Sequence, residues 1–453
     1  MASSVHPKPT LPDTTRSDEL YARANGLIPA CTQTLDKGPG QHVRGVAPKY
    51  LLRGKGSHVW DVDGNEFIDY SMAAGPLSLG YAYPAVDRAI RAQLEDGITF
   101  SLMHPLEVEV AELIREVVPN AEMVRYGTTG SDATSAAVRL ARAYTGRSKV
   151  LCCGHHGWHD WSIAVTDRNR GIPQSVRDLS RTFAYNDIQS ATDSIDDDVA
   201  CVILEPMAFE EPRDNFLQRL RELCTGRGIV LVFDEVWTGF RLALGGAQQH
   251  FGVDADLMCY SNAVANGMPI SVLAGRSEIM RLCERDVFFF TTFGGEALSL
   301  AAAKATILEL RDRKVPDALA RQGRKLKDGY TDIARQLGMT YTACAGMDCR
   351  TVVTFDADAG NPLEMKSLVQ QEMIRRGVLW GGSHNISYSH SDEDIAHTLT
   401  AYREILPVLK RAVEDKNIRS YLRGEPVEPV LRLAGNFNPN PGGWRRPENL
   451  VNL

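Results

Sequence analysis

The sequence predicts an α/β protein whose sheet is buried on both faces. Five apolar residues run without interruption from Ile229 to Phe233, directly after a glycine, and a second apolar run covers residues 199–204. Continuous apolar runs of this length are typical of strands that helices cover on both faces. The two runs are followed by acids, Asp234 and Glu205. Because ligands of open α/β sheets bind at the carboxyl ends of the strands, we expect a ligand site there.

The composition is that of an ordinary globular chain. Its 453 residues are 43% hydrophobic and 24% charged, which allows more than one domain. The net charge of -7 gives no indication of binding to nucleic acid or to an anionic membrane. The chain has no apolar stretch of about 18 residues and no signal-peptide core at its N-terminus, so we expect a cytoplasmic protein without a membrane span. The nine cysteines include no C-x-x-C pair, which favours reduced thiols over a zinc site.

The flanking segments fit this fold class. A polar arm (residues 1–18) precedes alternating apolar positions on both sides of Asp63-Gly64, a pair typical of two-residue hairpin turns. A helical period extends over residues 104–118. Beyond about residue 311, helical segments with many charges surround a strand-like run at residues 350–355.

A turn of small residues precedes a predicted helix at residues 131–144. Gly127 and Gly130 free the backbone, and Ser131 begins the helix. A turn of this composition is most often only a helix cap. The first N–H groups of a helix also lack intrahelical acceptors and can bind a phosphate. The residues by themselves leave both interpretations open.

A loop rich in histidine follows the strand-like residues 149–153. His155, His156 and His159 have the spacing H-H-x-x-H, which matches no usual zinc site, and we predict no metal there. Trp158 lies in the same loop and is expected to line the cleft.

Several motifs together give the chain a family resemblance. The strand ending in Asp234 continues as DEVWTGFR, a second strand follows at residues 256–261, and ANGMP occupies residues 265–269. With these motifs the chain resembles the class III, fold-type I aminotransferases that depend on pyridoxal 5'-phosphate (PLP). Within that family it is most similar to the glutamate-1-semialdehyde aminomutase-like branch.

The resemblance implies a fold-type I PLP-dependent transferase in three parts. An N-terminal arm and hairpin segment covers residues 1–70. A large PLP-binding domain, with a mostly parallel sheet between helices, covers residues 71–310. A smaller α+β domain with a tail covers residues 311–453. The resemblance also implies a homodimer with shared active sites, because Thr292 matches a threonine that reaches the phosphate of the neighbouring subunit.

The resemblance further implies which residues bind the cofactor. Asp234 would pair with the pyridinium nitrogen, and a carboxylate beside that nitrogen does keep it protonated. His155 occupies the position of an aromatic residue that stacks on the ring, and Val236 matches the residue on the other ring face. The other matches lie around the phosphate and the ring substituents: Thr129, Gly130, Ser131, Gly157 and Glu205.

One position departs from the family pattern. The Schiff-base lysine of the family corresponds to Asn262, and no lysine lies between Lys149 and Lys304. A carboxamide is neither an amine nucleophile nor a general base. We expect an inactivating Lys-to-Asn replacement that traps pyridoxamine 5'-phosphate (PMP) or an external aldimine. The alternatives are a natural lysine-less PLP-fold protein that binds a ligand as a regulatory module, and a PLP enzyme that uses His155 or His156 for proton transfer.

The substrates implied are a small-molecule amino donor and a keto or aldehyde acceptor. The aminomutase binds its substrate carboxylate through an arginine near the N-terminus, and Arg44 is not in clear register with it. We therefore expect an amino or keto sugar, or another hydroxylated carbonyl compound, rather than glutamate-1-semialdehyde. The candidate substrate-contact residues are Arg44, Trp158, Arg241, His384 and Asn385.

Overall fold

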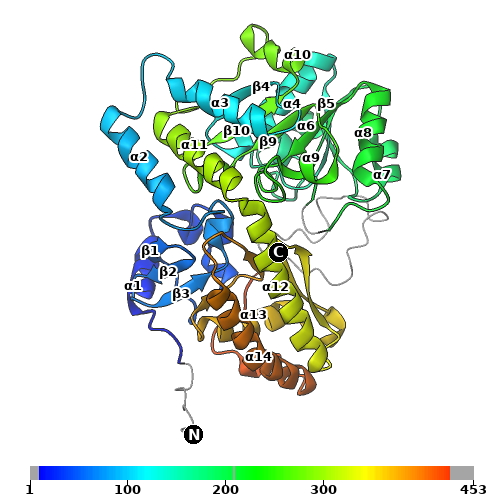
Figure 1. Cartoon of the computed structure of the whole chain (residues 1–453). Helices are drawn as coiled ribbons and strands as arrows, with labels where there is room; N and C mark the ends of the chain where they lie inside the picture. The colour runs from blue at the N-terminus through cyan, green and yellow to red at the C-terminus, as the bar shows by residue number, and fades with distance from the viewer. Residues whose placement is uncertain (1–9, 208–209, 429–453) are drawn as a thin grey trace.

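The computed structural model describes residues 10–207 and 210–428 and contains two lobes (Figure 1). The upper lobe is built on a seven-stranded sheet with the order β4-β10-β9-β8-β7-β5-β6. Within it, β10 is antiparallel to both of its neighbours, whereas β5 to β9 run parallel to one another. The predicted α/β fold with a mostly parallel sheet is confirmed. The strands are β4 (Met123–Gly127), β5 (Lys149–Cys153), β6 (Ser180–Thr182), β7 (Val199–Leu204), β8 (Val230–Asp234), β9 (Leu257–Tyr260) and β10 (Ser271–Gly275).

Helices cover both faces of this sheet. Because successive side chains of a strand point to opposite faces, Val230 and Val232 of β8 pack in the cluster that contains α4. Leu231 and Phe233 pack in the cluster that contains α3, α8 and α11. The helices of this lobe are α2 (Pro84–Asp96), α3 (Pro105–Val117), α4 (Gly130–Thr145), α5 (Asp160–Ile163), α6 (Gln174–Arg177), α7 (Ile188–Ser194), α8 (Phe216–Arg227), α9 (Gly246–Phe251), α10 (Ser277–Met280) and α11 (Ala297–Asp312).

The lower lobe brings the two ends of the described chain together (Figure 1). A four-stranded sheet has the order β1-β2-β3-β13, in which β13 pairs in parallel with β3, and a three-stranded antiparallel sheet has the order β11-β12-β14. The strands are β1 (Leu51–Lys55), β2 (His58–Asp61), β3 (Glu66–Asp69), β11 (Thr342–Met347), β12 (Arg350–Phe355), β13 (Val378–Leu379) and β14 (Ser383–Asn385). The helices are α1 (Thr15–Ala24), α12 (Val315–Gln336), α13 (Pro362–Ile374) and α14 (Asp392–Glu414).

The turn between β2 and β3 differs from the two-residue turn that the sequence predicts. The loop consists of residues 62–64 and is closed by the backbone N–H of Asp61, which donates to the carbonyl of Asn65 (3.0 Å). The Asp61 carboxylate accepts hydrogen bonds from the backbone N–H groups of Asp63 (3.0 Å) and Asn65 (2.8 Å). A side-chain acceptor of this kind imitates a backbone turn, and the Asp-Gly pair alone does not reveal it.

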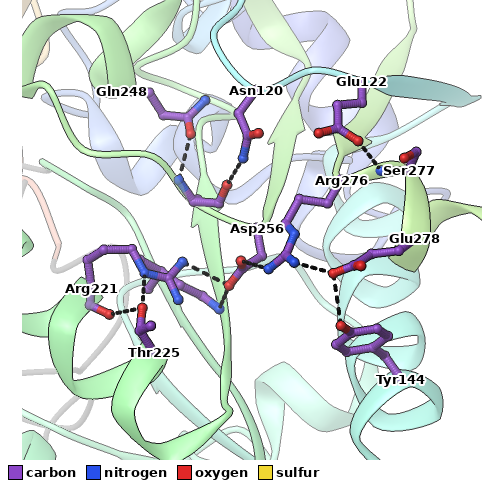
Figure 2. A network of polar contacts seen from close by, with 12 residues as sticks. Asn120, Glu122, Tyr144, Arg221, Thr225, Gln248, Asp256, Arg276, Ser277 and Glu278 are labelled. Atoms are coloured by element: carbon purple, nitrogen blue, oxygen red, sulfur yellow. Dashed lines mark hydrogen bonds and ion pairs between the residues drawn. The ribbon is translucent and has the colours of Figure 1, made fainter.

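Figure 2 shows a polar network at the amino end of β9. Oδ2 of Asp256 accepts hydrogen bonds from Arg221 (2.8 Å) and from the backbone N–H of Leu231 (2.7 Å). Oδ1 of Asp256 accepts one from Arg276 (2.9 Å), which also contacts Glu278. The network therefore connects α8, β8, β9 and α10 at the edge opposite the carboxyl ends of the parallel strands.

We expect Asp256→Ala to lower the free energy of unfolding by about 2–4 kcal/mol. The change removes a carboxylate that is 5% exposed and takes the side-chain acceptor away from the N–H of Leu231. Denaturant titration measures the loss. Asp254→Ala, at an exposed neighbouring position, is the matched control and should cost less than about 0.5 kcal/mol. Equal losses in the two variants would show that the network does not stabilise the sheet.

Candidate functional site

The carboxyl edge of the seven-stranded sheet brings predicted site residues from distant parts of the chain together. Asp234 is the last residue of β8, and Glu205 directly follows β7. His155 follows the end of β5, and Asn262 follows the end of β9. Because these four strands are parallel, their carboxyl ends lie at one edge. The candidate site is the cleft at this edge.

Asp234 forms a buried pair with His156. Oδ2 of Asp234 lies 2.8 Å from Nδ1 of His156, and Oδ1 accepts a hydrogen bond from the backbone N–H of Val236 (3.1 Å). Asp234 is 4% and His156 is 2% exposed. A buried carboxylate needs a donor or a cation, and the imidazole N–H supplies one. The sequence predicts a cationic partner for this acid without identifying it, and the structure identifies His156.

Glu235 points away from the cleft, although it is the neighbour of Asp234. Its carboxylate accepts hydrogen bonds from the hydroxyl of Thr238 (2.7 Å) and from the backbone N–H groups of Ala247 (2.7 Å) and Gln248 (3.1 Å) in the first turn of α9. Burial, the largest effect, raises the pKa of Glu235 to about 7. Glu235 therefore caps α9, and only Asp234 of the two acids belongs to the site.

The amino end of α4 forms a narrow cradle with the histidine loop. Gly157, at a φ of 99°, lies so close to Ser131 that a Cβ at position 157 would be 2.1 Å from Oγ of Ser131. A Cβ at Gly130 would be 3.0 Å from Val236. Thr129 caps α4 in a reciprocal capping box with Asp132. The first N–H groups of the helix have no intrahelical acceptor, so this cradle suits a phosphate or another anion.

Glu205 and His155 lie at the next strand ends. Oε1 of Glu205 accepts a hydrogen bond from the backbone N–H of His155 (2.9 Å). Burial is the main cause that raises the pKa of Glu205, and the nearby Asp234 acts in the same direction. The His155 side chain touches solvent, yet the surrounding protein lowers its pKa. The pattern is that of an imidazole on the wall of a cleft.

Asn262 begins the short 3-10 turn η5 (Asn262–Ala265) with a φ of 33°. Its side chain is half-buried, and it has no hydrogen-bond partner among residues 10–207 and 210–428. An amide at this position can donate or accept a hydrogen bond, but it cannot form an imine or take up a proton. The site therefore lacks a nucleophilic amine at the position where the resemblance places one.

The other predicted residues lie in different surroundings. Trp158 is 73% exposed, and its backbone N–H donates to Oγ of Ser131 (3.3 Å). Thr292 is exposed in the turn before α11. Arg44 forms an exposed ion pair with Glu428 (3.1 Å) and lines a cavity of about 290 Å³ beside the N-terminal segment.

The predicted substrate contact of His384 is wrong. The side chain has no exposed surface, and its ring nitrogens lie 2.8 Å from the hydroxyl of Thr351 and 2.7 Å from the hydroxyl of Tyr402. Burial lowers its pKa to about 3, so the ring is neutral. With both nitrogens engaged, His384 packs in the core of the lower lobe and offers nothing to a ligand.

Asn385 and Arg241 retain polar groups that the protein does not satisfy. Nδ2 of Asn385 donates to the carbonyl of Ser71 (2.9 Å), whereas its buried Oδ1 has no partner among the described residues. Arg241 is 3% exposed and donates to the carbonyl of Gly75. Its guanidinium carbon lies 4.4 Å from the centre of the Trp237 ring.

Sequence analysis missed three residues at this site. His156 was matched to the family but was not assigned to Asp234, and Trp237 and Arg350 were not singled out. The guanidinium carbon of Arg350 lies 4.6 Å from the ring centre of Trp237. Arg350 is more than one hundred residues from Trp237 in the chain, and no local pattern predicts such a contact. The order D-E-V-W could have directed attention to Trp237, since it follows Asp234 closely.

Two negative findings concern the described part of the chain. Within residues 10–207 and 210–428, no cluster of three or more His, Cys, Asp or Glu side chains is arranged to hold a metal ion. None of the helices in these two ranges is both long and apolar enough to cross a membrane.

Comparisons with known proteins agree with this geometry. The family model for class-III aminotransferases matches residues 42–385. The 3-aminobutyryl-CoA aminotransferase of Cloacimonas acidaminovorans is 35% identical over 409 residues, which cover 87% of this chain and 98% of the relative. A glutamate-1-semialdehyde 2,1-aminomutase of Thermodesulfovibrio yellowstonii is 32% identical over 434 residues, covering 87% of this chain and 100% of the relative. The PLP internal aldimine form of the FumI protein of Sphingopyxis has a TM-score of 0.83 at 29% identity, covering 90% of this chain and 100% of that one.

Proposed function

The chain belongs to the class-III aminotransferase family, and from this premise we propose that its cleft binds PLP or PMP for amino-group transfer between a small-molecule amine and a keto or aldehyde compound. The observation that carries the proposal is the buried Asp234–His156 pair. A carboxylate held in place at the carboxyl edge of the sheet is suited to pair with a protonated ring nitrogen. The cradle at the amino end of α4 lies beside it and suits a phosphate.

The residues of the cleft fit a phosphorylated pyridine. Asp234 would hold the ring nitrogen, with His156 fixing the orientation of the carboxylate. Val236 and His155 would contact the two ring faces, and Glu205 would support the ring substituents. When bound, the protonated ring supplies an electron sink for the carbanion that forms on a substrate. The phosphate would be held by Thr129, Gly130, Ser131 and Gly157.

Asn262 separates binding of the cofactor from turnover. The contacts to ring and phosphate do not involve Asn262, so the chain as it stands should hold PMP, or PLP combined with an amine, without a covalent bond to the protein. Loss of a general acid–base group typically costs about 10²–10⁴-fold in rate. We therefore infer that this exact sequence binds the cofactor but turns over slowly or not at all.

The amide at position 262 also supports a second candidate function. A cleft with an intact cradle and no amine can serve as a ligand-binding module with a regulatory role. The third possibility, a histidine that replaces the lysine in proton transfer, receives less support. His156 is buried behind Asp234, and its Nδ1 is engaged by that carboxylate. Restoring the lysine distinguishes the first two candidates, because only an aminotransferase gains turnover.

The acceptor belongs, in our proposal, to the hydroxylated carbonyl compounds, which include amino and keto sugars. Oδ1 of Asn385 is a buried acceptor without a partner among the described residues, and a substrate hydroxyl would satisfy it. Asn385 pairs in register with Arg350, which places both side chains on the same part of the lower lobe.

The proposed active form is a homodimer with shared sites. Large apolar side chains are exposed on two neighbouring segments that the backbone N–H of Ala297 links to the carbonyl of Ile98 (2.9 Å). The exposed side chains are Leu102 (80%), Met103 (82%), Phe288 (75%), Phe290 (66%) and Phe293 (61%). Contiguous apolar surface of this kind is typical of an interface. Thr292 lies within this surface, where a second chain could reach it.

Sedimentation analysis tests the dimer. It should give the mass of two chains of 49.9 kDa each. A monomer at micromolar concentration would show that the apolar surface has another purpose.

Titration calorimetry with PMP tests the proposed cofactor site. The unaltered chain should bind PMP, and it should bind pyridoxamine, which lacks the phosphate, at least about tenfold more weakly, since charge-assisted contacts are lost. The pyridoxamine titration is the matched control for ring binding alone. A chain that does not take up PMP would contradict the proposed function.

A further inference from the structure

Arg350 lies at the boundary between the lower lobe and the cleft. It is the first residue of β12, and its guanidinium lies against Trp237, three residues after Asp234. The carboxylate of Glu205 acts on it, since it raises the pKa of Arg350. Because Glu205 also binds the backbone of His155, Arg350 reaches the wall of the cleft to which both belong.

The surroundings of Arg350 favour an additional anion. The side chain keeps some solvent access, yet burial is the largest effect on its pKa and lowers it. The opposing effects of Glu205 and Asp36 are smaller. A charged group in such a place is under-compensated by its own chain, and a negatively charged ligand would stabilise it.

Arg241 adds a second positive charge to the same indole. It is 3% exposed, and among the described residues it forms no ion pair with a carboxylate. Its Nε is buried without a hydrogen-bond partner. Burial, the main effect, and the charge of Arg350 both lower the pKa of Arg241, here to about 9. Two guanidinium groups on Trp237 repel each other unless an anion lies near them.

The space beside Arg350 can admit a ligand. Asp36, whose charge acts on Arg350, lines the cavity of about 290 Å³ next to the N-terminal segment. Ser71 lines the same cavity, and its carbonyl accepts the hydrogen bond from Asn385. Asn385 is the register partner of Arg350 and carries the unpartnered acceptor Oδ1. The cation and the acceptor thus belong to neighbouring strands at the border of one cavity.

We propose that the substrate of this cleft carries a carboxylate and that Arg350 binds it, with Trp237 and Arg241 as positioning residues. The planar guanidinium matches a carboxylate through two parallel hydrogen bonds. A hydroxyl or amine of the same substrate would donate to Oδ1 of Asn385. The substrate class becomes an amino or keto acid, hydroxylated beside its acid group. The inference rests on the proposed cofactor site and narrows its substrate.

Two stable probes can measure this preference without turnover. They are N-phosphopyridoxyl-β-alanine, which carries the carboxylate, and N-phosphopyridoxyl-propylamine, which lacks it but has the same length. The pair with γ-aminobutyrate and butylamine provides a longer reach. Calorimetry with the unaltered chain should give about 10- to 100-fold tighter binding of the carboxylate probe in at least one pair. PMP serves as the reference ligand in every titration.

The preference should depend on Arg350. In Arg350→Gln the ratio between the two probes should fall to about one, while PMP affinity changes by less than about threefold. Arg350→Lys keeps the charge without the planar fork and should retain part of the preference. Arg91→Gln, at an arginine that is 80% exposed on α2, is the matched control and should leave the ratio unchanged. Far-UV circular dichroism of each variant verifies that it is folded.

Three results would overturn the inference. Equal binding of the two probes by the unaltered chain, in both lengths, would show that no carboxylate is recognised, and this result needs no variant. An undiminished preference in Arg350→Gln would place the recognition elsewhere. Failure of PMP and of all four probes to bind would contradict the proposed function itself and, with it, this inference. PMP binding without discrimination would contradict the inference alone.

Discussion

Replacing Asn262 by lysine should convert the chain into a yellow protein that holds PLP covalently and transfers amino groups. The lysine would supply the amine and the proton acceptor that the amide lacks, while Asp234 and the α4 cradle are unchanged by the substitution. We expect amino transfer to rise by at least about 10²–10⁴-fold over the unaltered chain. Absorbance spectra, the intact mass after borohydride reduction and product analysis with a panel of amines and carbonyl compounds measure the change.

The matched control at this position is Asn262→Met, which has a long side chain without an amine. It should bind PMP as the unaltered chain does, and it should show neither colour bound to the protein after reduction nor a gain in turnover. If Asn262→Lys binds PLP covalently and still transfers no amino group to any acceptor, the aminotransferase proposal fails. The ligand-binding module would then be the better description of the protein.

The second large effect is expected from Asp234→Asn. This change keeps the size of the side chain, and the amide oxygen can still accept the hydrogen bond from His156, but the negative charge is lost. A charged hydrogen bond to the ring nitrogen contributes about 1.5–3 kcal/mol, so PMP affinity should fall about 10- to 100-fold. Calorimetry measures the affinity. In the Asn262→Lys background the same change should also reduce amino transfer, because the ring is less protonated.

Glu235→Gln is the matched control for this experiment, since it removes a negative charge at the adjacent residue. Glu235 accepts three hydrogen bonds from Thr238 and α9, so the control should lower thermal stability and leave PMP affinity unchanged. If both variants lost PMP affinity equally, the assignment of Asp234 rather than Glu235 to the cofactor would be wrong.

The arrangement of strands and the edge that carries the site were predictable from the sequence. The apolar runs at residues 199–204 and 229–233 each form a buried strand, because only a strand covered on both faces tolerates apolar side chains at every position. The acids after these runs lie at the carboxyl edge of a parallel sheet for a topological reason, since parallel strands end on the same side. Local order along the chain contains this information.

The partners of the site residues could not be predicted in this way. Asp234 bonds His156, whereas Glu235 bonds the first turn of α9, and the sequence DE does not indicate which acid enters the cleft. His384 has the composition of a substrate contact but is enclosed by Thr351 and Tyr402. Each outcome depends on which segments the fold brings against the residue.

By itself, the sequence determined the α/β class, the family and the absence of lysine at position 262, because strand burial, motif order and residue identity are written along the chain. The tertiary structure alone decided that Arg241 and Arg350 share the indole of Trp237 and that Asn385 keeps a free acceptor beside them. These contacts join residues that are distant in the chain. Their energies come from burial and charge, which exist only after the two lobes have packed together.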